Sequence, residues 1–104
     1  MAHAEDTKAN VIEIATFELA DGVTAAEFAK IDARVEAEHV SQQPGFVSRE
    51  TGATETGWLV IVHWESSDAA QASMDSFASA PAAAAFMSKL DASTMSMTRY
   101  DLNK

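Results

Sequence analysis

The sequence has no cysteine and little positive charge, and each shortage excludes a class of protein. Without cysteine there is no disulfide framework, no thiolate metal site and no cysteine nucleophile. Seven lysine and arginine residues stand against 16 aspartate and glutamate residues, a formal net charge of -9. Nucleic-acid binding needs a basic footprint, and an anionic membrane surface attracts basic segments. We therefore expect no nucleic-acid partner and no membrane partner.

Long apolar runs and phosphate-binding loops are also absent. No stretch approaches the roughly 20 apolar residues that span a bilayer, and the polar first eight residues show no secretory signal. We expect a cytoplasmic protein with a flexible N-terminus at residues 1–9 and a single domain at residues 10–104. The sequence contains neither a glycine-rich phosphate loop nor a nucleophile elbow. No nucleotide or other cofactor is therefore expected.

Hydrophobic patterns and turn residues predict the element order β-α-β-β-α-β. Thr24 and Glu27 form a capping box that begins the first helix, and Pro44-Gly45 ends it. This order is typical of the ferredoxin-like α+β fold, a four-stranded antiparallel sheet with its helices on one face. Strands are expected at residues 10–19, 46–51, 57–65 and 93–102, and helical segments at residues 24–43, 66–77 and from Pro81, with Ala70, Met74, Phe77, Phe86, Met87 and Leu90 turned inward.

The strand at residues 57–65 is apolar on both faces. Successive side chains of a strand alternate between faces, and a solvated face should be polar. Two helices cover only one face, so the second face predicts a partner sheet from another copy of the chain, forming a homodimeric α/β barrel. The two groups of side chains are Trp58, Val60, Val62 and Trp64 on one face and Leu59, Ile61 and His63 on the other.

Three segments resemble a known family. They are IATFELADG in the first strand, the turn QPGF, and HWESSDAA at the start of the second helix. Together they resemble the antibiotic biosynthesis monooxygenase-like group of the dimeric α/β-barrel superfamily, over residues 11–102. The resemblance implies a homodimer with one pocket per subunit, bordered by the aromatic residue of the Trp-Glu-Ser step, here Trp64.

The sequence departs from the quinone-forming oxygenases of this group beside that aromatic residue. Polar side chains accompany it in those enzymes, whereas this chain has Val60, Ala70 and the alanine run at residues 82–85. The leading interpretation is a cofactor-independent monooxygenase that acts on a small aromatic or carbonyl compound. The departure favours the alternative, a non-enzymatic ligand-binding or stress-responsive dimer.

His39 and His63 are the candidate catalytic bases. If Trp64 faces the barrel interior, His63 faces the helices, where His39 could lie near it and form a proton relay. The end of the first helix should raise the pKa of His39 slightly, and we expect His39 to be the more reactive of the two. The alternatives are two structural histidines or an axial haem ligand. No metal site is expected, because a third ligand is not evident.

Trp64, Trp58, Tyr100 and Arg49 are the candidate ligand-binding residues. The two indoles could form an aromatic wall for a flat ligand, or they could serve core and dimer packing. Tyr100 belongs to a polar stripe of the last strand, and either Tyr100 or Arg49 could stabilise developing negative charge. Alternatively, Arg49 makes a rim ion pair with its neighbour Glu50.

Overall fold

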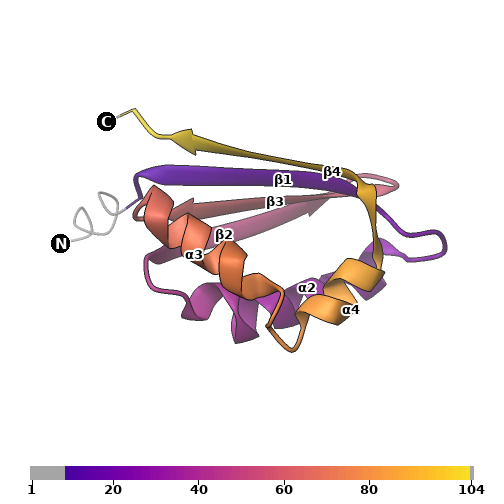
Figure 1. Cartoon of the computed structure of the whole chain (residues 1–104). Coiled ribbons are helices and arrows are strands. Elements are labelled where there is room, and N and C mark those ends of the chain that lie inside the picture. Colours follow the sequence, from indigo (N-terminus) through magenta and orange to yellow (C-terminus); the bar gives the residue numbers. More distant parts are fainter. Residues whose placement is uncertain (1–8, 104) are drawn as a thin grey trace.

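The computed structural model describes residues 9–103, and its elements follow the predicted order (Figure 1). The flexibility predicted for residues 1–9 concerns a segment that, apart from Ala9, lies outside the described residues. Within residues 9–103, none of the helices is long and apolar enough to cross a membrane. The strands are β1 (Val11–Leu19), β2 (Phe46–Ala53), β3 (Gly57–Trp64) and β4 (Leu90–Asp101), and the helices are α2 (Ala25–Glu38), α3 (Ser67–Phe77) and α4 (Ala83–Ser88), with a 3-10 turn η1 (Val40–Gln42).

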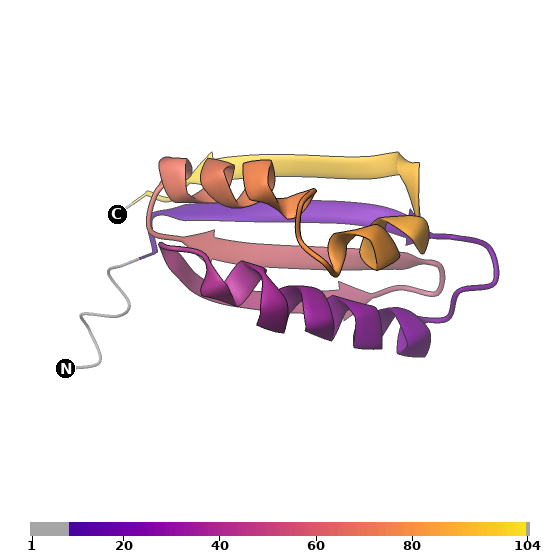
Figure 2. The same cartoon turned by 60° about the horizontal axis from the view of Figure 1, so that its bottom comes forward.

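The four strands form one antiparallel sheet in the order β2-β3-β1-β4. The three helices all lie on one face of this sheet, and its other face is open (Figures 1 and 2). Helix α2 runs beside β2 and β3, whereas α3 lies toward β1 and β4 (Figure 2). The ferredoxin-like fold predicted from the sequence is confirmed.

Helix α2 begins where the sequence predicts but ends earlier. The capping box is present, since the Glu27 amide donates to Thr24 Oγ1 over 3.1 Å and the Thr24 amide donates to Glu27 Oε1 over 3.0 Å. The α-helix ends at Glu38, and the Gln42 side chain beyond this end donates to the Ala37 carbonyl. The chain then continues as the 3-10 turn η1.

The packing of β3 shows which of its two apolar faces meets the helices. The face that carries both tryptophans is buried beneath the helices, and the face that carries His63 is half-buried on the open side of the sheet. The indoles fill the helix-covered layer. Trp58 packs edge-on against Phe28 with ring centroids 5.1 Å apart, and Trp64 packs edge-on against Phe46 with ring centroids 6.0 Å apart. The expectation that Trp64 faces a partner sheet and His63 faces the helices is therefore wrong.

A buried ion pair joins α2 to the sheet. Arg49 on β2 forms two hydrogen bonds of 2.7 and 2.8 Å with the carboxylate of Asp32, and a third of 3.1 Å with Glu36. The Trp58 indole donates to the same Asp32 carboxylate over 3.3 Å. The side chains of Arg49 and Asp32 are only 2% and 6% exposed. The rim pair expected between Arg49 and Glu50 is therefore wrong, because strand alternation turns Arg49 under α2.

The ion pair also sets the charge state of the arginine. Burial by itself lowers the pKa of Arg49, but the hydrogen bonds and negative charges of Asp32 and Glu36 more than offset this effect and raise it. Arg49 therefore stays charged inside the fold. Its carboxylate partners are what make that buried charge tolerable.

Replacing Arg49 by alanine is expected to destabilise the fold strongly. The change leaves the buried Asp32 carboxylate without its cation, and breaking a buried pair costs about 3 to 5 kcal/mol. The matched control is Arg34→Ala, which removes the exposed Arg34–Glu38 pair on α2, the helix that carries Asp32, and should leave the free energy of unfolding nearly unchanged. Urea unfolding followed by circular dichroism measures both changes. Equal losses in the two variants would contradict the structural role of Arg49.

Candidate functional site

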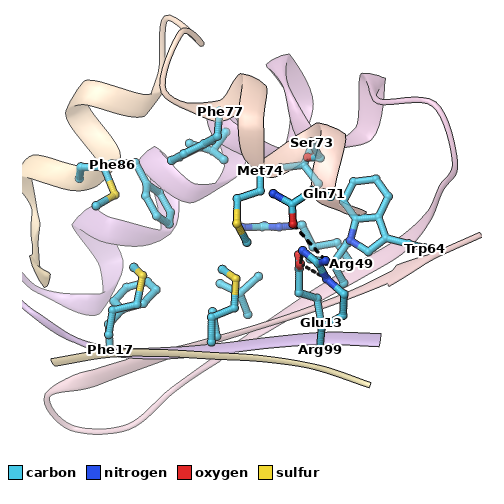
Figure 3. A pocket seen from close by; sticks show the side chains of 18 residues that line it. Glu13, Phe17, Arg49, Trp64, Gln71, Ser73, Met74, Phe77, Phe86 and Arg99 are labelled. Atoms are coloured by element: carbon cyan, nitrogen blue, oxygen red, sulfur yellow. Dashed lines mark hydrogen bonds and ion pairs between the residues drawn. The ribbon is translucent and has the colours of Figure 1, made fainter. Parts of the chain in front are cut away.

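A cavity of about 610 Å³ lies between the helix-covered face of the sheet and the three helices (Figure 3). Its wall consists mostly of aromatic, aliphatic and methionine side chains from all four strands and all three helices. This volume lies within the range of small-molecule sites, which are mostly apolar with a few placed polar groups.

The polar side chains of the cavity gather at one end (Figure 3). Phe17, Phe77 and Phe86 lie at the opposite end of the view, which makes the cavity polar at one end and aromatic at the other. A ligand that fits both ends would have a flat apolar body and one polar edge. The polar group comprises Glu13, Arg49, Trp64, Gln71, Ser73 and Arg99.

Three methionines mark where the cavity meets solvent. Met74 on α3, Met87 on α4 and Met97 on β4 all line the cavity, and they are 40%, 39% and 45% exposed. The opening therefore lies between the α3 and α4 helices and the edge strand β4. Met74 and Met87 lie on the inner sides of their helices as predicted, since both line the cavity, but they stay partly exposed at its opening.

Two buried donors at the polar end lack an acceptor. Among the described residues, neither Trp64 Nε1 nor Arg49 Nε has a hydrogen-bond partner, although both atoms are buried. An unpaired buried donor costs about 1 to 3 kcal/mol. In Figure 3 the ring nitrogen of Trp64 is turned toward the side where Arg49 and Glu13 lie. Trp64 and Arg49 are thus the two predicted ligand-binding residues that line the cavity.

His39 lies at the end of α2, outside the cavity lining. Its Nε2 is 2.8 Å from Ser76 Oγ, its ring meets Phe77 edge-on at 5.7 Å, and its buried Nδ1 has no partner among the described residues. Burial lowers the pKa of His39 below the usual value of about 6.5. The slight rise expected from the helix end is therefore wrong, since desolvation outweighs the dipole. His39 is neutral near pH 7.

The other sequence-predicted residues also lie away from the cavity. His63 is on the open face, where its Nδ1 is 3.3 Å from Ser48 Oγ, so the predicted pairing of His63 with His39 is wrong. Tyr100 is on the same open face and 53% exposed. Trp58 is buried against Phe28 and does not border the cavity. Within residues 9–103, no cluster of three or more metal-ligating side chains is present.

Sequence reasoning missed the charged residues under the helices. Glu13 alternates with Val11 and Ala15 on the buried side of β1, and Asp32 falls on the apolar stripe between Phe28 and Val35. A charged residue at a position with buried periodicity is the signal that could have found both. Their partners Arg99 and Arg49 lie on β4 and β2, and neither pairing follows from spacing along the chain.

Comparison with known proteins supports the fold assignment. SnoaB from Streptomyces nogalater, described as a cofactor-independent oxygenase, superposes with a TM-score of 0.74 at 22% identity, over 92% of this chain and 95% of that one. The chain shares its fold with SnoaB. A candidate antibiotic biosynthesis monooxygenase from Caulobacter crescentus superposes with a TM-score of 0.72 at 22% identity, over the full length of both chains.

Some of the other matches have no activity in their descriptions. A conserved protein from Methanosarcina mazei superposes with a TM-score of 0.73 at 9% identity, over 97% of this chain and 99% of that one. No family model matches the sequence. No curated protein matches it either. The shared fold at these identities locates a pocket but does not assign a reaction.

The lowered pKa of His39 predicts a specific loss of stability in mild acid. The unfolded chain binds the proton more readily than the folded one, so stability is full above about pH 7 and falls as the pH drops below about 6.5. The fall ends below the folded pKa, and its slope is at most about 1.4 kcal/mol per pH unit. His39→Gln should remove this component. Urea unfolding of both proteins between pH 7.5 and 5 tests it, and identical slopes would contradict the prediction.

Proposed function

We propose that this protein is a cofactor-independent oxygenase that oxidises a flat aromatic carbonyl compound bound in the cavity. The observation that carries the proposal is the buried indole N–H of Trp64, which has no partner within residues 9–103 and lies at the polar end of an otherwise apolar cavity. A ligand carbonyl oxygen is the acceptor that such a donor lacks. The fold shared with SnoaB, itself described as a cofactor-independent oxygenase, supports this choice.

The reaction uses dioxygen as the oxidant. A ring CH₂ that lies para to a ring ketone loses two hydrogens and gains one oxygen atom, while the second oxygen atom leaves as water. The substrate first gives up a proton and becomes an electron-rich anion. Trp64 then donates to the oxygen that carries the negative charge, and the cationic Arg49 nearby favours that charge further. The apolar wall keeps water away from the anion.

The alternative is a ligand-binding protein without turnover. It is favoured by Val60, which lines the cavity on the same strand face as Trp64 and brings no polar group. It is also favoured by the positions of His39 and His63, since neither borders the cavity. Binding without oxygen consumption is the result that would distinguish this alternative.

Anthrone is a suitable probe, because it is a flat tricyclic ketone with an acidic ring CH₂. We expect wild-type protein to bind anthrone under nitrogen, and in air to consume one dioxygen per anthraquinone formed. Trp64→Phe keeps an aromatic ring but removes the N–H, so it should lower the rate about 10²-fold. Calorimetry and an oxygen electrode measure the two quantities.

The matched control for that variant is Trp58→Phe, which removes an indole N–H bound to Asp32 outside the cavity. Its rate should stay near that of the wild type. Anthrone binding without any oxygen consumption would replace the oxygenase with the ligand-binding alternative. No binding at all would reject the cavity as an aromatic ketone site.

The open face of the sheet is proposed to bind a second copy of the chain. Ile12, Ile14, Leu59 and Ile61 are half-buried aliphatic side chains on this face, and none of the helices within residues 9–103 covers them. Contiguous apolar surface of this kind marks an interface. A face-to-face pair of sheets would bury it and enclose His63 and Tyr100 between the subunits.

Sedimentation at micromolar concentration should give about 22 kDa, twice the 11.1 kDa mass of the chain. Ile61→Glu should give the monomer mass, because it places a charge in the apolar centre of the interface. Ala29→Glu adds the same negative charge on the exposed face of α2 and should leave the dimer intact. A wild-type monomer would reject this interface.

A further inference from the structure

Glu13 is a carboxylate that lines the mostly apolar cavity. It lies on the central strand β1, between Val62 of β3 and Arg99 of β4, and its side chain is 10% exposed. The residue borders the cavity at its polar end (Figure 3). A charged group in this position is costly unless it is paired and hydrogen-bonded.

The pairing of Glu13 is one-sided. Arg99 Nε and Nη2 both donate to the same oxygen, Glu13 Oε2, over 3.0 and 2.8 Å. The third nitrogen, Nη1, donates instead to Gln71 Oε1 on α3 over 3.3 Å. Among residues 9–103, Glu13 Oε1 accepts no side-chain hydrogen bond, and Glu13 is one of the residues that line the cavity.

A purely structural pair would be expected to look different. Arginine and carboxylate usually form a fork in which each carboxylate oxygen receives one N–H, because two parallel bonds are stronger. Here two nitrogens of Arg99 donate to the same oxygen, Glu13 Oε2, and among the described residues none donates a side-chain hydrogen bond to Oε1. A carboxylate oxygen that has no hydrogen-bond donor can accept a proton from a bound ligand.

From this geometry we infer that Glu13 is the general base of the cavity and takes the acidic proton of the bound aromatic ketone through Oε1. This inference rests on the proposed function and supplies the base that it requires. In the step, the C–H bond of the ring CH₂ breaks and an O–H bond forms on Glu13 Oε1. The electron pair stays on the ring and spreads onto the ketone oxygen, so the step needs no oxidant.

Hydrogen–deuterium exchange isolates this step from oxidation. Anthrone is incubated with the protein in D₂O under nitrogen, and loss of the CH₂ signal is followed by proton NMR. Wild-type protein should accelerate exchange over buffer. Glu13→Gln keeps the size of the side chain and its acceptor oxygen for Arg99, so it should lower the protein-dependent rate about 10²- to 10⁴-fold and leave anthrone affinity nearly unchanged.

The matched control is Glu38→Gln, which removes a carboxylate from an arginine pair on the exposed face of α2. Its exchange rate should equal that of the wild type. Glu13→Gln with a wild-type exchange rate would overturn the inference. So would formate that fails to restore exchange in Glu13→Ala, since a small carboxylate in the vacated space should replace the missing base.

A second variant separates a loss of exchange from a loss of folding by removing both charges of the pair. The double variant Glu13→Gln/Arg99→Met takes away both charges, a change that is often neutral for stability. A folded double variant, judged by circular dichroism, must also lose exchange; retained exchange would overturn the inference. Wild-type protein that binds anthrone without accelerating exchange overturns it too, while leaving the binding site in place. Wild-type protein that neither binds nor exchanges rejects the proposed function and the inference together.

Discussion

The buried pair of Asp32 and Arg49 is the interaction on which the arrangement of this protein depends. It links α2, β2 and, through the Trp58 indole, β3 at a single point beneath the helix. Because the two charges must meet with good geometry to offset their desolvation, the helix can dock on the sheet in very few ways. That docking leaves the space toward α3 and α4 in which the cavity lies. The pair thus fixes the position of α2 and places a cation in the cavity wall.

The charged side chains under the helices form two separate ion pairs with different surroundings. Arg49 binds Asp32 through two nitrogens and both carboxylate oxygens, whereas Arg99 binds a single oxygen of Glu13. The first arrangement satisfies the carboxylate, and the second leaves it one free acceptor. The Arg49–Asp32 pair is therefore suited to stabilising the fold, and the Arg99–Glu13 pair is suited to catalysis. The pairs differ in burial as well, since the Arg49 side chain is 2% exposed and the Arg99 side chain is 24% exposed.

The order of elements could be predicted because local signals agree with the final fold. The capping box at Thr24, the turn at Pro44-Gly45 and the alternation in the last strand each correspond to an observed boundary or face. The orientation of β3 could not be predicted in the same way. Both of its faces are apolar, so alternation grouped Trp58 with Trp64 correctly but did not tell which group meets the helices.

The candidate site was harder to predict for a related reason. Trp64 and Arg49 could be found because one is a large aromatic residue at a family-like step and the other is a cation within a strand. Glu13 and Asp32 resemble solvated charges until their partners are known, and those partners come from distant strands. The two histidines were proposed as bases because of the proton chemistry of imidazole, and not because their positions in the fold were known. Their positions were decided by where α2 ends and by which face of β3 is turned outward.

The methionines at the opening have a consequence for how quickly a ligand enters. Met74, Met87 and Met97 border the opening from three different elements, and each side chain is unbranched with three rotatable bonds. Exposed side chains change rotamer on the picosecond to nanosecond timescale, far faster than a hinge or lid moves. A rigid flat molecule can therefore enter while the backbone stays in place. Access to this cavity is controlled by side-chain rotation at its edge, so diffusion of the ligand, and not a slow opening of the fold, sets the rate of entry.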